Sequence, residues 1–300
     1  MEYVKLNNGV EMPILGYGVY QIPKEETKKC VLEALKVGYR SIDTAQSYFN
    51  ESEVGEAIKE SGIPRNEIFI TSKVWIDNYG YEKCRKSVLE SLDKMGLDYI
   101  DLMLLHQPFA DYYGAYRALE DLYEEGKIKA IGVSNFYPDR LADICLFERK
   151  VVPAINQVET NPINAQFKAQ ENMEKYGVHI EAWAPFGEGR NGLFENEILV
   201  NIGKKYDKSA AQVILRWLIQ RGVIIACKST HIERMEQNFN VFDFKLTDED
   251  MEEIKKIDRN DSLFFNHQDP NMVEWFDKMV VERRRNNDCR KEKKGWDDNE

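Results

Sequence analysis

The stretch CRKSVLESLDKMGLDYIDLMLLH, residues 84–106, decides the fold, because a helical pattern in it ends at a glycine and an apolar run follows at once. Cys84, Val88 and Leu92 stand four residues apart, which places them on one face of a helix. Gly96 can adopt the left-handed backbone conformation that ends a helix without a Cβ penalty. The stretch therefore predicts a helix, a tight turn and a buried strand.

The same pattern of helix, glycine and apolar run recurs along the chain. Glycines at positions 38, 126, 177 and 222 also lead directly into short apolar runs. Counted as strands, the apolar runs number eight, at residues 14–19, 39–43, 68–73, 99–105, 128–133, 153–158, 178–183 and 223–227. Strands that alternate with helices favour parallel βα units. Eight units in about 250 residues fit a (β/α)8 or TIM barrel of the α/β class, although alternation alone also permits a doubly wound sheet.

Both ends of the chain carry features outside this repeat. Residues 4–15 read VKL, an Asn-Asn-Gly turn and VEMPIL, which predicts an additional β-hairpin. The hairpin would either cap the closed end of a barrel or form a simple edge strand. Residues 277–300 hold eight basic and seven acidic side chains, so we expect a solvated tail that extends a helix or is disordered. The predicted division is a barrel domain over 1–276 and a charged tail over 277–300.

Composition and charge exclude several classes of protein. Of the 300 residues 43% are hydrophobic, as in globular proteins, and the net charge of −11 argues against nucleic acid or an anionic membrane as the main partner. The sequence shows no signal peptide and no apolar run of membrane-spanning length. Five cysteines, with no CxxC pair, predict neither a disulfide framework nor a zinc site; they stand at 30, 84, 145, 227 and 289. We therefore expect a cytoplasmic protein.

Polar and aromatic side chains stand where the predicted strands end. In a parallel barrel the chemistry takes place at the C-terminal ends of the strands. Each of the residues listed below has an ordinary structural explanation when taken alone, such as a helix cap or a surface lysine. Asp and Lys, however, are seldom found in a barrel interior unless they are paired. The residues are Asp43, Lys73, His106, Ser134, Asn135, Gln157, Trp183 and Lys228, with Tyr48 in the loop that follows Asp43.

Four of these residues form a set that could protonate a carbonyl oxygen. Free tyrosine has a pKa of about 10, and an adjacent Lys73 ammonium is expected to lower the pKa of Tyr48 by ~1–3 units. Asp43 would keep Lys73 charged and in place, and His106 could donate a hydrogen bond to an oxygen that gains negative charge. General acid assistance of this kind accelerates a reaction by ~10²–10⁴. No metal is predicted, because the sequence lacks HExxH and the other histidines lack ligand spacing.

Six segments that carry these residues resemble the signature motifs of the aldo-keto reductase family. They are GYRSIDTAQSYFNESEVG (38–55), ITSKVW (70–75), LLHQPF (104–109), IGVSNF (131–136), INQVE (155–159) and CKSTHIERMEQN (227–238). The resemblance covers residues 3–276 and points to a bacterial-type member, close to the diketogluconate reductase and prostaglandin F synthase-like branch. It implies a TIM barrel with an N-terminal hairpin and an NADPH-dependent reductase of small aldehydes and ketones that works as a monomer.

The resemblance also implies a role for each residue. Tyr48 would be the proton donor, Lys73 and Asp43 would tune it, and His106 would orient the carbonyl group. The expected cofactor-binding residues are Asp43, Ser134, Asn135, Gln157, Trp183, Ala184, Pro185, Phe186, Gly187, Lys228, Ser229, Thr230, Arg234, Gln237 and Asn238. The expected substrate-binding residues are Tyr20, Trp75, His106 and Phe109.

This sequence departs from the family pattern at a few positions. Trp183 stands where the family usually has Tyr, and either ring offers a flat face for stacking. Tyr20 and Gln107 stand where Trp is common, which predicts a more polar substrate mouth. Gln237 stands where many members have Glu, which leaves the adenine contacts open.

Two cations near the predicted eighth strand favour NADPH over NADH. Lys228, Ser229 and Arg234 would offer two positive charges and a hydroxyl to the adenosine 2′-phosphate. A competing dinucleotide-binding motif, GxGxxG, occurs at Gly187–Gly192. It follows the seventh of eight predicted strands, and Glu188 would bring negative charge towards a pyrophosphate. We therefore interpret this segment as a flexible flap over the cofactor rather than a Rossmann site.

Two other functions are compatible with such a barrel. One is an NADPH-binding sensor or regulatory subunit with little turnover. The other is an isomerase that binds a sugar phosphate without a cofactor. The presence of all four catalytic residue types favours the reductase.

Overall fold

The computed structural model describes residues 1–147 and 149–297, which belong to two compact units, Met1–Leu263 and a second that begins at Phe264. The first unit contains a closed barrel of eight parallel strands, in which the last strand pairs with the first. In chain order these are β3 (Leu15–Gly18), β4 (Ser41–Asp43), β5 (Phe69–Val74), β6 (Leu102–Leu105), β7 (Ile131–Ser134), β8 (Ile155–Glu159), β9 (His179–Trp183) and β10 (Ile224–Cys227). The predicted TIM barrel is confirmed, and the doubly wound alternative is excluded.

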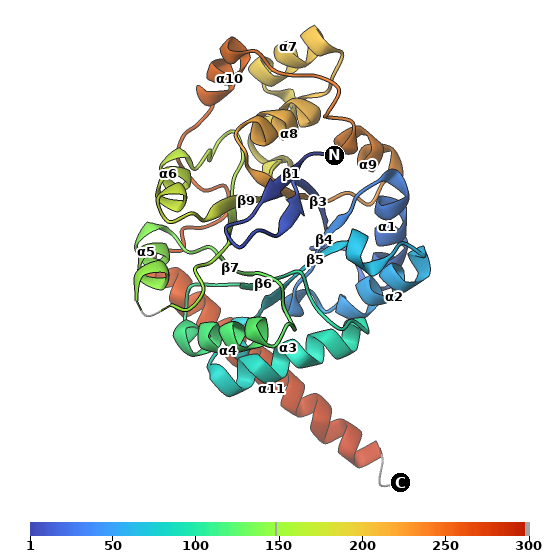
Figure 1. Cartoon of the computed structure of the whole chain (residues 1–300), viewed down its shortest axis with the longest axis vertical. Helices are drawn as coiled ribbons and strands as arrows, with labels where there is room; N and C mark the ends of the chain where they lie inside the picture. The colour runs from blue at the N-terminus through green and yellow to red at the C-terminus, as the bar shows by residue number, and fades with distance from the viewer. Residues whose placement is uncertain (148, 298–300) are drawn as a thin grey trace. The chain divides into compact units, whose positions relative to one another are not determined.

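Helices surround the strands of this unit (Figure 1). The helix of the deciding stretch buries Cys84, Val88 and Leu92, and Gly96 follows it with φ +63°, as predicted. The α-helices are α1 (Lys24–Val37), α2 (Glu51–Ser61), α3 (Tyr81–Met95), α4 (Tyr112–Glu124), α5 (Pro138–Leu146), α6 (Phe167–Lys175), α7 (Glu197–Tyr206), α8 (Ala210–Gln220), α9 (Ile232–Phe239) and α10 (Asp248–Lys255). Short 3₁₀ segments are η1 (Gln46–Tyr48), η2 (Arg65–Glu67), η3 (Ile76–Asn78) and η4 (Gly187–Glu195).

The N-terminal hairpin covers the end of the barrel at which the strands begin. Its strands, β1 (Tyr3–Lys5) and β2 (Glu11–Pro13), pair antiparallel in a sheet of their own. The side-chain amide of Asn7 donates to Pro153 O at 3.0 Å, and that of Asn8 donates to Lys129 O at 2.9 Å. Both carbonyl groups lie just before a barrel strand begins, and Figure 1 shows the hairpin in front of the strands. The capping alternative is therefore confirmed: the hairpin lies at the end of the barrel opposite to the one at which the strands end.

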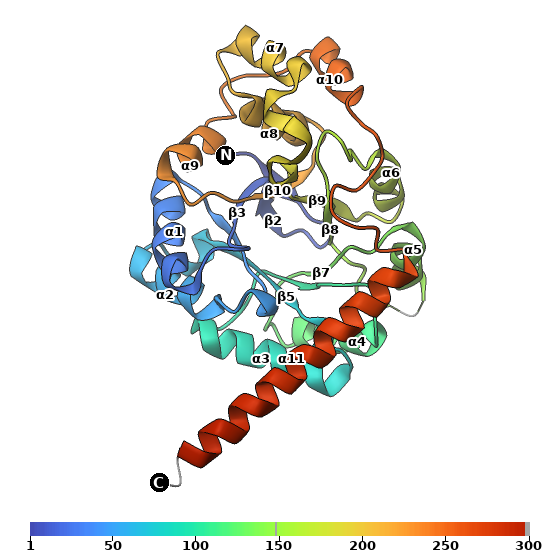
Figure 2. The ribbon, with the colours of Figure 1, turned by 180° about the vertical axis from the view of Figure 1, so that it is seen from behind.

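The second unit contains one long helix, α11 (Pro270–Asp297), which is drawn in red in Figure 2. Before and within its first turns the rings of Phe265, Trp275 and Phe276 contact one another, with centroids 5.0 to 6.4 Å apart. The helix runs across position 276 and reaches Asp297, and the choice between a helical and a disordered tail stays a prediction. The division into a domain over 1–276 and a tail over 277–300 stays a prediction. In the described part of the chain no helix has the length and apolar content that a bilayer span requires.

Strand alternation decides which side chains enter the barrel. Ser72 of β5 donates to Glu51 of α2 at 2.7 Å, so it points outward. Lys73, the next residue, therefore points inward. The register places Lys73 beside Leu104 of β6, and Leu104 beside Gly132 of β7. Gly132 leaves the interior space that Leu104 fills, because a Cβ there would lie 2.5 Å from Leu104 Cδ2.

We expect Gly132→Ala to lower the free energy of unfolding by roughly 1–3 kcal/mol, because the added methyl group overpacks the barrel interior. Chemical denaturation monitored by tryptophan fluorescence measures this change. Gly18→Ala is the matched control, because its Cβ would meet neighbouring atoms only at 3.8 Å or more. Equal stability of the two variants would contradict the packing argument.

Candidate active site

A buried ion pair lies at the centre of the candidate site. Lys73 is fully buried, and its Nζ donates to Asp43 Oδ1 at 2.5 Å and to Thr44 O at 3.0 Å. Burial alone lowers the pKa of Lys73, but the Asp43 carboxylate, together with Tyr48 and Glu181, more than offsets this effect, and the pKa is raised overall. Lys73 is therefore an ammonium ion at neutral pH, as the sequence predicted.

Tyr48 lies beside this ion pair, but its acidity differs from the prediction. Its hydroxyl lies 3.3 Å from Lys73 Nζ, which is direct hydrogen-bond distance. The expected lowering of its pKa is wrong: burial raises the pKa of Tyr48 to about 12, and Asp43 adds to the rise. Lys73 favours the phenolate but only partly offsets these effects. Tyr48 is therefore a neutral phenol at pH 7, which can donate a proton but not accept one.

His106 and two aromatic side chains, Tyr20 and Trp75, lie near the Tyr48 ring. The His106 ring stands edge-on to Tyr48 at 5.8 Å and to Trp75 at 5.3 Å, measured between centroids. The ring of Tyr20, which is exposed, lies 5.0 Å from that of Tyr48. Ser47 Oγ is 3.4 Å from His106 Nδ1, a contact that the sequence did not predict. The structure thus brings His106, Tyr20 and Trp75 to the rim at which Tyr48 lies.

Polar side chains from β7, β8 and β9 form a hydrogen-bonded group next to Asp43. Gln157 Nε2 donates to Asp43 Oδ2 at 2.9 Å. Trp183 Nε1 donates to Asn135 Oδ1 at 2.9 Å, and Asn135 Nδ2 donates to Ser134 Oγ at 3.1 Å. These contacts fix the orientation of the Asn135 amide and of the indole ring. The four residues predicted to hold a nicotinamide therefore lie together, and one of them, Gln157, contacts the ion pair.

The chain after β10 supplies the predicted phosphate-binding residues. Lys228 follows the strand directly, Arg234 lies in the first turn of α9, and both are exposed. Neither forms an ion pair with any residue that the structure describes. Ser229 is buried, and its Oγ accepts a hydrogen bond from His231 N at 3.1 Å. Thr230, Gln237 and Asn238 lie on the same loop and helix. Two unpaired cations beside the N–H groups of a helix start form a donor set that suits a phosphate group.

The segment with the GxGxxG pattern is not a strand, loop and helix of the Rossmann type. Ala184–Gly187 leave β9 and lead into η4, where Glu188 and Asn191 have positive φ in addition to the glycines. The next α-helix begins only at Glu197. This irregular backbone agrees with the interpretation as a loop, and its role as a flap stays a prediction.

One residue differs from what the sequence analysis expected, and another was missed. Gln107 is buried, and its Oε1 accepts from Asn135 Nδ2 at 3.5 Å, so it adds little polarity to the substrate mouth. Phe109 is half-buried two residues further on. Glu181 of β9 was missed, although it is buried and acts electrostatically on Asp43 and Lys73. A single acidic residue in the apolar run VHIEAW, two residues before Trp183, was the available signal.

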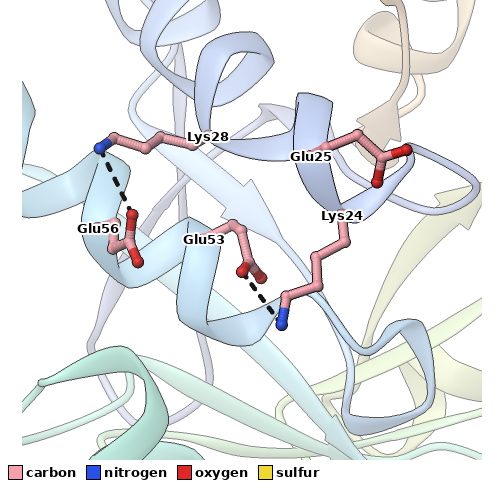
Figure 3. A pocket seen from close by; sticks show the side chains of 5 residues that line it. All are labelled: Lys24, Glu25, Lys28, Glu53 and Glu56. Carbon is pink, nitrogen blue, oxygen red and sulfur yellow. Dashed lines mark ion pairs between the residues drawn. The ribbon is translucent and has the colours of Figure 1, made fainter.

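The surface also carries two hollows away from the Tyr48 hydroxyl. One of about 360 Å³ lies between α1 and α2, where Lys24 pairs with Glu53 and Lys28 with Glu56, each at 3.4 Å (Figure 3). Both of its lysines are held in ion pairs, and none of the predicted site residues lines it. The other, of about 480 Å³, is lined by Asp207, Lys208, Gln212, Glu233, Glu236, Gln237 and Asn240. The described residues contain no group of three or more His, Cys, Asp or Glu that could hold a metal ion.

We expect the Tyr48 phenol to remain protonated well above pH 10 in the free protein, because burial disfavours the phenolate. The difference in ultraviolet absorbance between wild type and Tyr48→Phe, followed during alkaline titration, isolates this group. The step assigned to Tyr48 should lie near pH 12. A step below pH 10 would instead support the sequence-based expectation that Lys73 dominates.

Comparison with known proteins agrees with this site and fold. Residues 14–259 match the aldo/keto reductase family. The glyoxal reductase of Bacillus subtilis is 46% identical over 262 residues, which cover 87% of this chain and 94% of that protein. The structure of an aldo-keto reductase from a Medee basin deep-sea metagenome library superposes with a TM-score of 0.86 at 44% identity, over 89% of this chain and 98% of that chain. A Bombyx mori aldo-keto reductase, solved in complex with NADP, gives a TM-score of 0.84 at 34% identity, over 88% and 95%.

These similarities extend over nearly the whole length of the relatives. They cover all eight barrel strands, and the Bacillus subtilis relative agrees with the predicted bacterial type. The chain belongs to the aldo/keto reductase family of oxidoreductases.

Proposed function

We propose that the chain reduces the carbonyl group of small aldehydes and ketones to an alcohol with NADPH, and that Tyr48 is the proton donor. The observation that carries this proposal is the 3.3 Å distance between the Tyr48 hydroxyl and Lys73 Nζ, itself bound to Asp43 at 2.5 Å. No other described tyrosine hydroxyl contacts a buried ammonium group. A tyrosine hydroxyl beside an ammonium group can donate a proton to an oxygen atom on which negative charge develops during a reaction.

The proton balance of the reaction assigns a task to each residue. When bound, NADPH supplies the hydride that the carbonyl carbon receives. The carbonyl oxygen takes the proton from the Tyr48 hydroxyl, and the Lys73 ammonium stabilises the phenolate that remains. The pKa of Tyr48, about 12, does not prevent this transfer, because the forming alkoxide is a stronger base than a phenolate. His106, whose ring stands edge-on to that of Tyr48, is proposed to orient the carbonyl group.

The cofactor assignment rests on the residues at both ends of the proposed cofactor site. Asn135, Gln157 and Ser134 would hold the nicotinamide amide, and Trp183 would stack on the ring. Lys228 and Arg234 would bind the 2′-phosphate, since each is exposed and without an ion pair among the described residues. The NADP in the Bombyx mori structure supports this proposal.

The substrate would enter between aromatic side chains. Tyr20 and Trp75 lie beside Tyr48 and His106, and Phe109 is close in sequence to His106. Such a mouth suits small carbonyl compounds with an apolar or planar part. The Bacillus subtilis relative is named for glyoxal, which makes glyoxal a suitable test substrate beside 4-nitrobenzaldehyde. We propose that the protein acts in the cytoplasm, as a monomer.

We expect Tyr48→Phe to slow the oxidation of bound NADPH by an aldehyde by ~10²–10⁴, because the proton donor is lost. The dissociation constant of NADPH should stay nearly the same. Single-turnover absorbance at the NADPH band gives the rate, and fluorescence titration gives the binding. Tyr81→Phe, on the surface of α3, is the control and should change neither quantity.

Retained turnover in Tyr48→Phe would remove Tyr48 as the donor. A wild-type protein that binds NADPH tightly but does not oxidise it with any aldehyde would favour the sensor function instead.

We expect Lys228→Ala combined with Arg234→Ala to weaken NADPH binding by roughly 1.5–3 kcal/mol for each charge-assisted contact. NADH binding should change little, because NADH lacks the 2′-phosphate. Calorimetric titration with both cofactors measures the difference. Lys29→Ala with Lys86→Ala removes the same charge from exposed positions on α1 and α3 and serves as the control. Equal losses for both cofactors would contradict the phosphate assignment.

A further inference from the structure

Glu181 is a buried carboxyl group next to the ion pair, and the proposed reaction gives it no task. It lies in the middle of β9 and is 1% exposed. Its register partner on β8 is Gln157, so the two side chains emerge on the same face of the sheet. Gln157 in turn donates to Asp43 Oδ2 at 2.9 Å. Glu181 therefore faces the barrel interior, and Gln157 links its position to Asp43, the counterion of Lys73.

Two carboxyl groups, Asp43 and Glu181, lie near a single ammonium group, Lys73, in the barrel interior. The charged groups that act on Glu181 are Asp43 of β4 and Lys73 of β5, while β8 contributes the neutral Gln157 and β10 the apolar Ile224. Lys73 already forms a close ion pair with Asp43. Glu181 Oε2 has no hydrogen-bond partner among the described residues. A second carboxylate there would be buried without a counterion, which costs several kcal/mol.

Glu181 therefore holds its proton at neutral pH. Burial, followed by the charge of Asp43, raises the pKa of Glu181 to about 8, while Lys73 and Gln157 act in the opposite direction. Below that pH the interior carries one positive and one negative charge. Above it a second negative charge appears close to Lys73. The charge of the cluster thus changes within a pH range in which the protein is folded.

The additional charge bears on the proton donor. Asp43 raises the pKa of Tyr48 and Lys73 lowers it, so the acidity of Tyr48 depends on how far the charge of Lys73 is neutralised. The Glu181 carboxylate acts on Lys73 in the same sense as Asp43 does. An ionised Glu181 thus makes Tyr48 a weaker acid and disfavours negative charge on the substrate oxygen.

We propose that Glu181 is a positioning residue that acts on Tyr48 through Lys73: as a neutral acid it permits carbonyl reduction, and as a carboxylate it slows the reaction. The proposal rests on the proposed function, because it assigns Tyr48 as the donor. It makes the reductase sensitive to alkaline pH through a residue that touches neither the substrate nor the cofactor.

The test compares the pH dependence of the wild type and Glu181→Gln, a variant of equal shape that cannot ionise. The rate of single-turnover NADPH oxidation by 4-nitrobenzaldehyde is measured from pH 6 to pH 10 with saturating NADPH. We expect the wild-type rate to fall by roughly tenfold above about pH 8, and Glu181→Gln to lack this step. Glu120→Gln, which alters a buried carboxyl group on α4, is the control and should keep the wild-type profile.

A second readout does not depend on turnover. A carboxyl group whose pKa is higher in the folded than in the unfolded chain loses stabilisation as the pH rises from its unfolded to its folded value. The free energy of unfolding of the wild type should therefore fall, relative to Glu181→Gln, between about pH 5 and pH 8 and then stay level. Coincident stability curves, or coincident rate profiles with normal turnover at pH 7, would overturn the role of Glu181.

The outcomes separate this proposal from the proposed function. A wild-type protein that does not oxidise NADPH at pH 7 overturns the proposed function and, with it, the role of Glu181 in the reaction. If Glu181→Gln does not fold, infrared titration of the wild type decides. A protonated carboxyl band that disappears with the same midpoint as the loss of rate supports the proposal, and the absence of such a band at pH 7 overturns it.

Discussion

The close contact between Lys73 and Asp43 inside the barrel is the interaction on which the candidate site depends. Both side chains are almost completely buried, and the loss of either partner would leave an isolated charge in an apolar interior. The pair fixes an ammonium group at a single position, 3.3 Å from the Tyr48 hydroxyl. Burying charged groups costs free energy and is rare in protein cores, but here it places a positive charge next to a phenol.

Burial disfavours the charged form of three ionisable groups at this site, namely Tyr48, Glu181 and Lys73 itself. It disfavours the phenolate of Tyr48 and the carboxylate of Glu181, so both hold their protons at neutral pH. Burial disfavours the charge of Lys73 as well, and the direct contact with Asp43 is the main effect that opposes it. The site thus holds one ion pair and two neutral acids: Tyr48, which lies at the rim, and Glu181, which is enclosed in the barrel.

The two ends of the proposed cofactor site differ in physical character. Asp43, Gln157 and Asn135 are buried and hydrogen-bonded, which suits precise placement of a reacting group. Around Lys228 and Arg234 the charges are exposed and adaptable, which suits selection of a phosphate group. In the proposed function, reaction geometry and cofactor selection would therefore be supported by separate parts of the barrel rim.

The sequence by itself determined the alternation of helices and strands, because glycines after amphipathic stretches and buried apolar runs are local signals. It also determined which side chains reach the open rim, since strand ends share one edge of a parallel barrel. Only the tertiary structure decided the protonation of Tyr48 and the closeness of Glu181 to Asp43. The acidity of a phenol depends on how completely water is excluded from it, and the contact across β4, β5, β8 and β9 exists only once the barrel is closed.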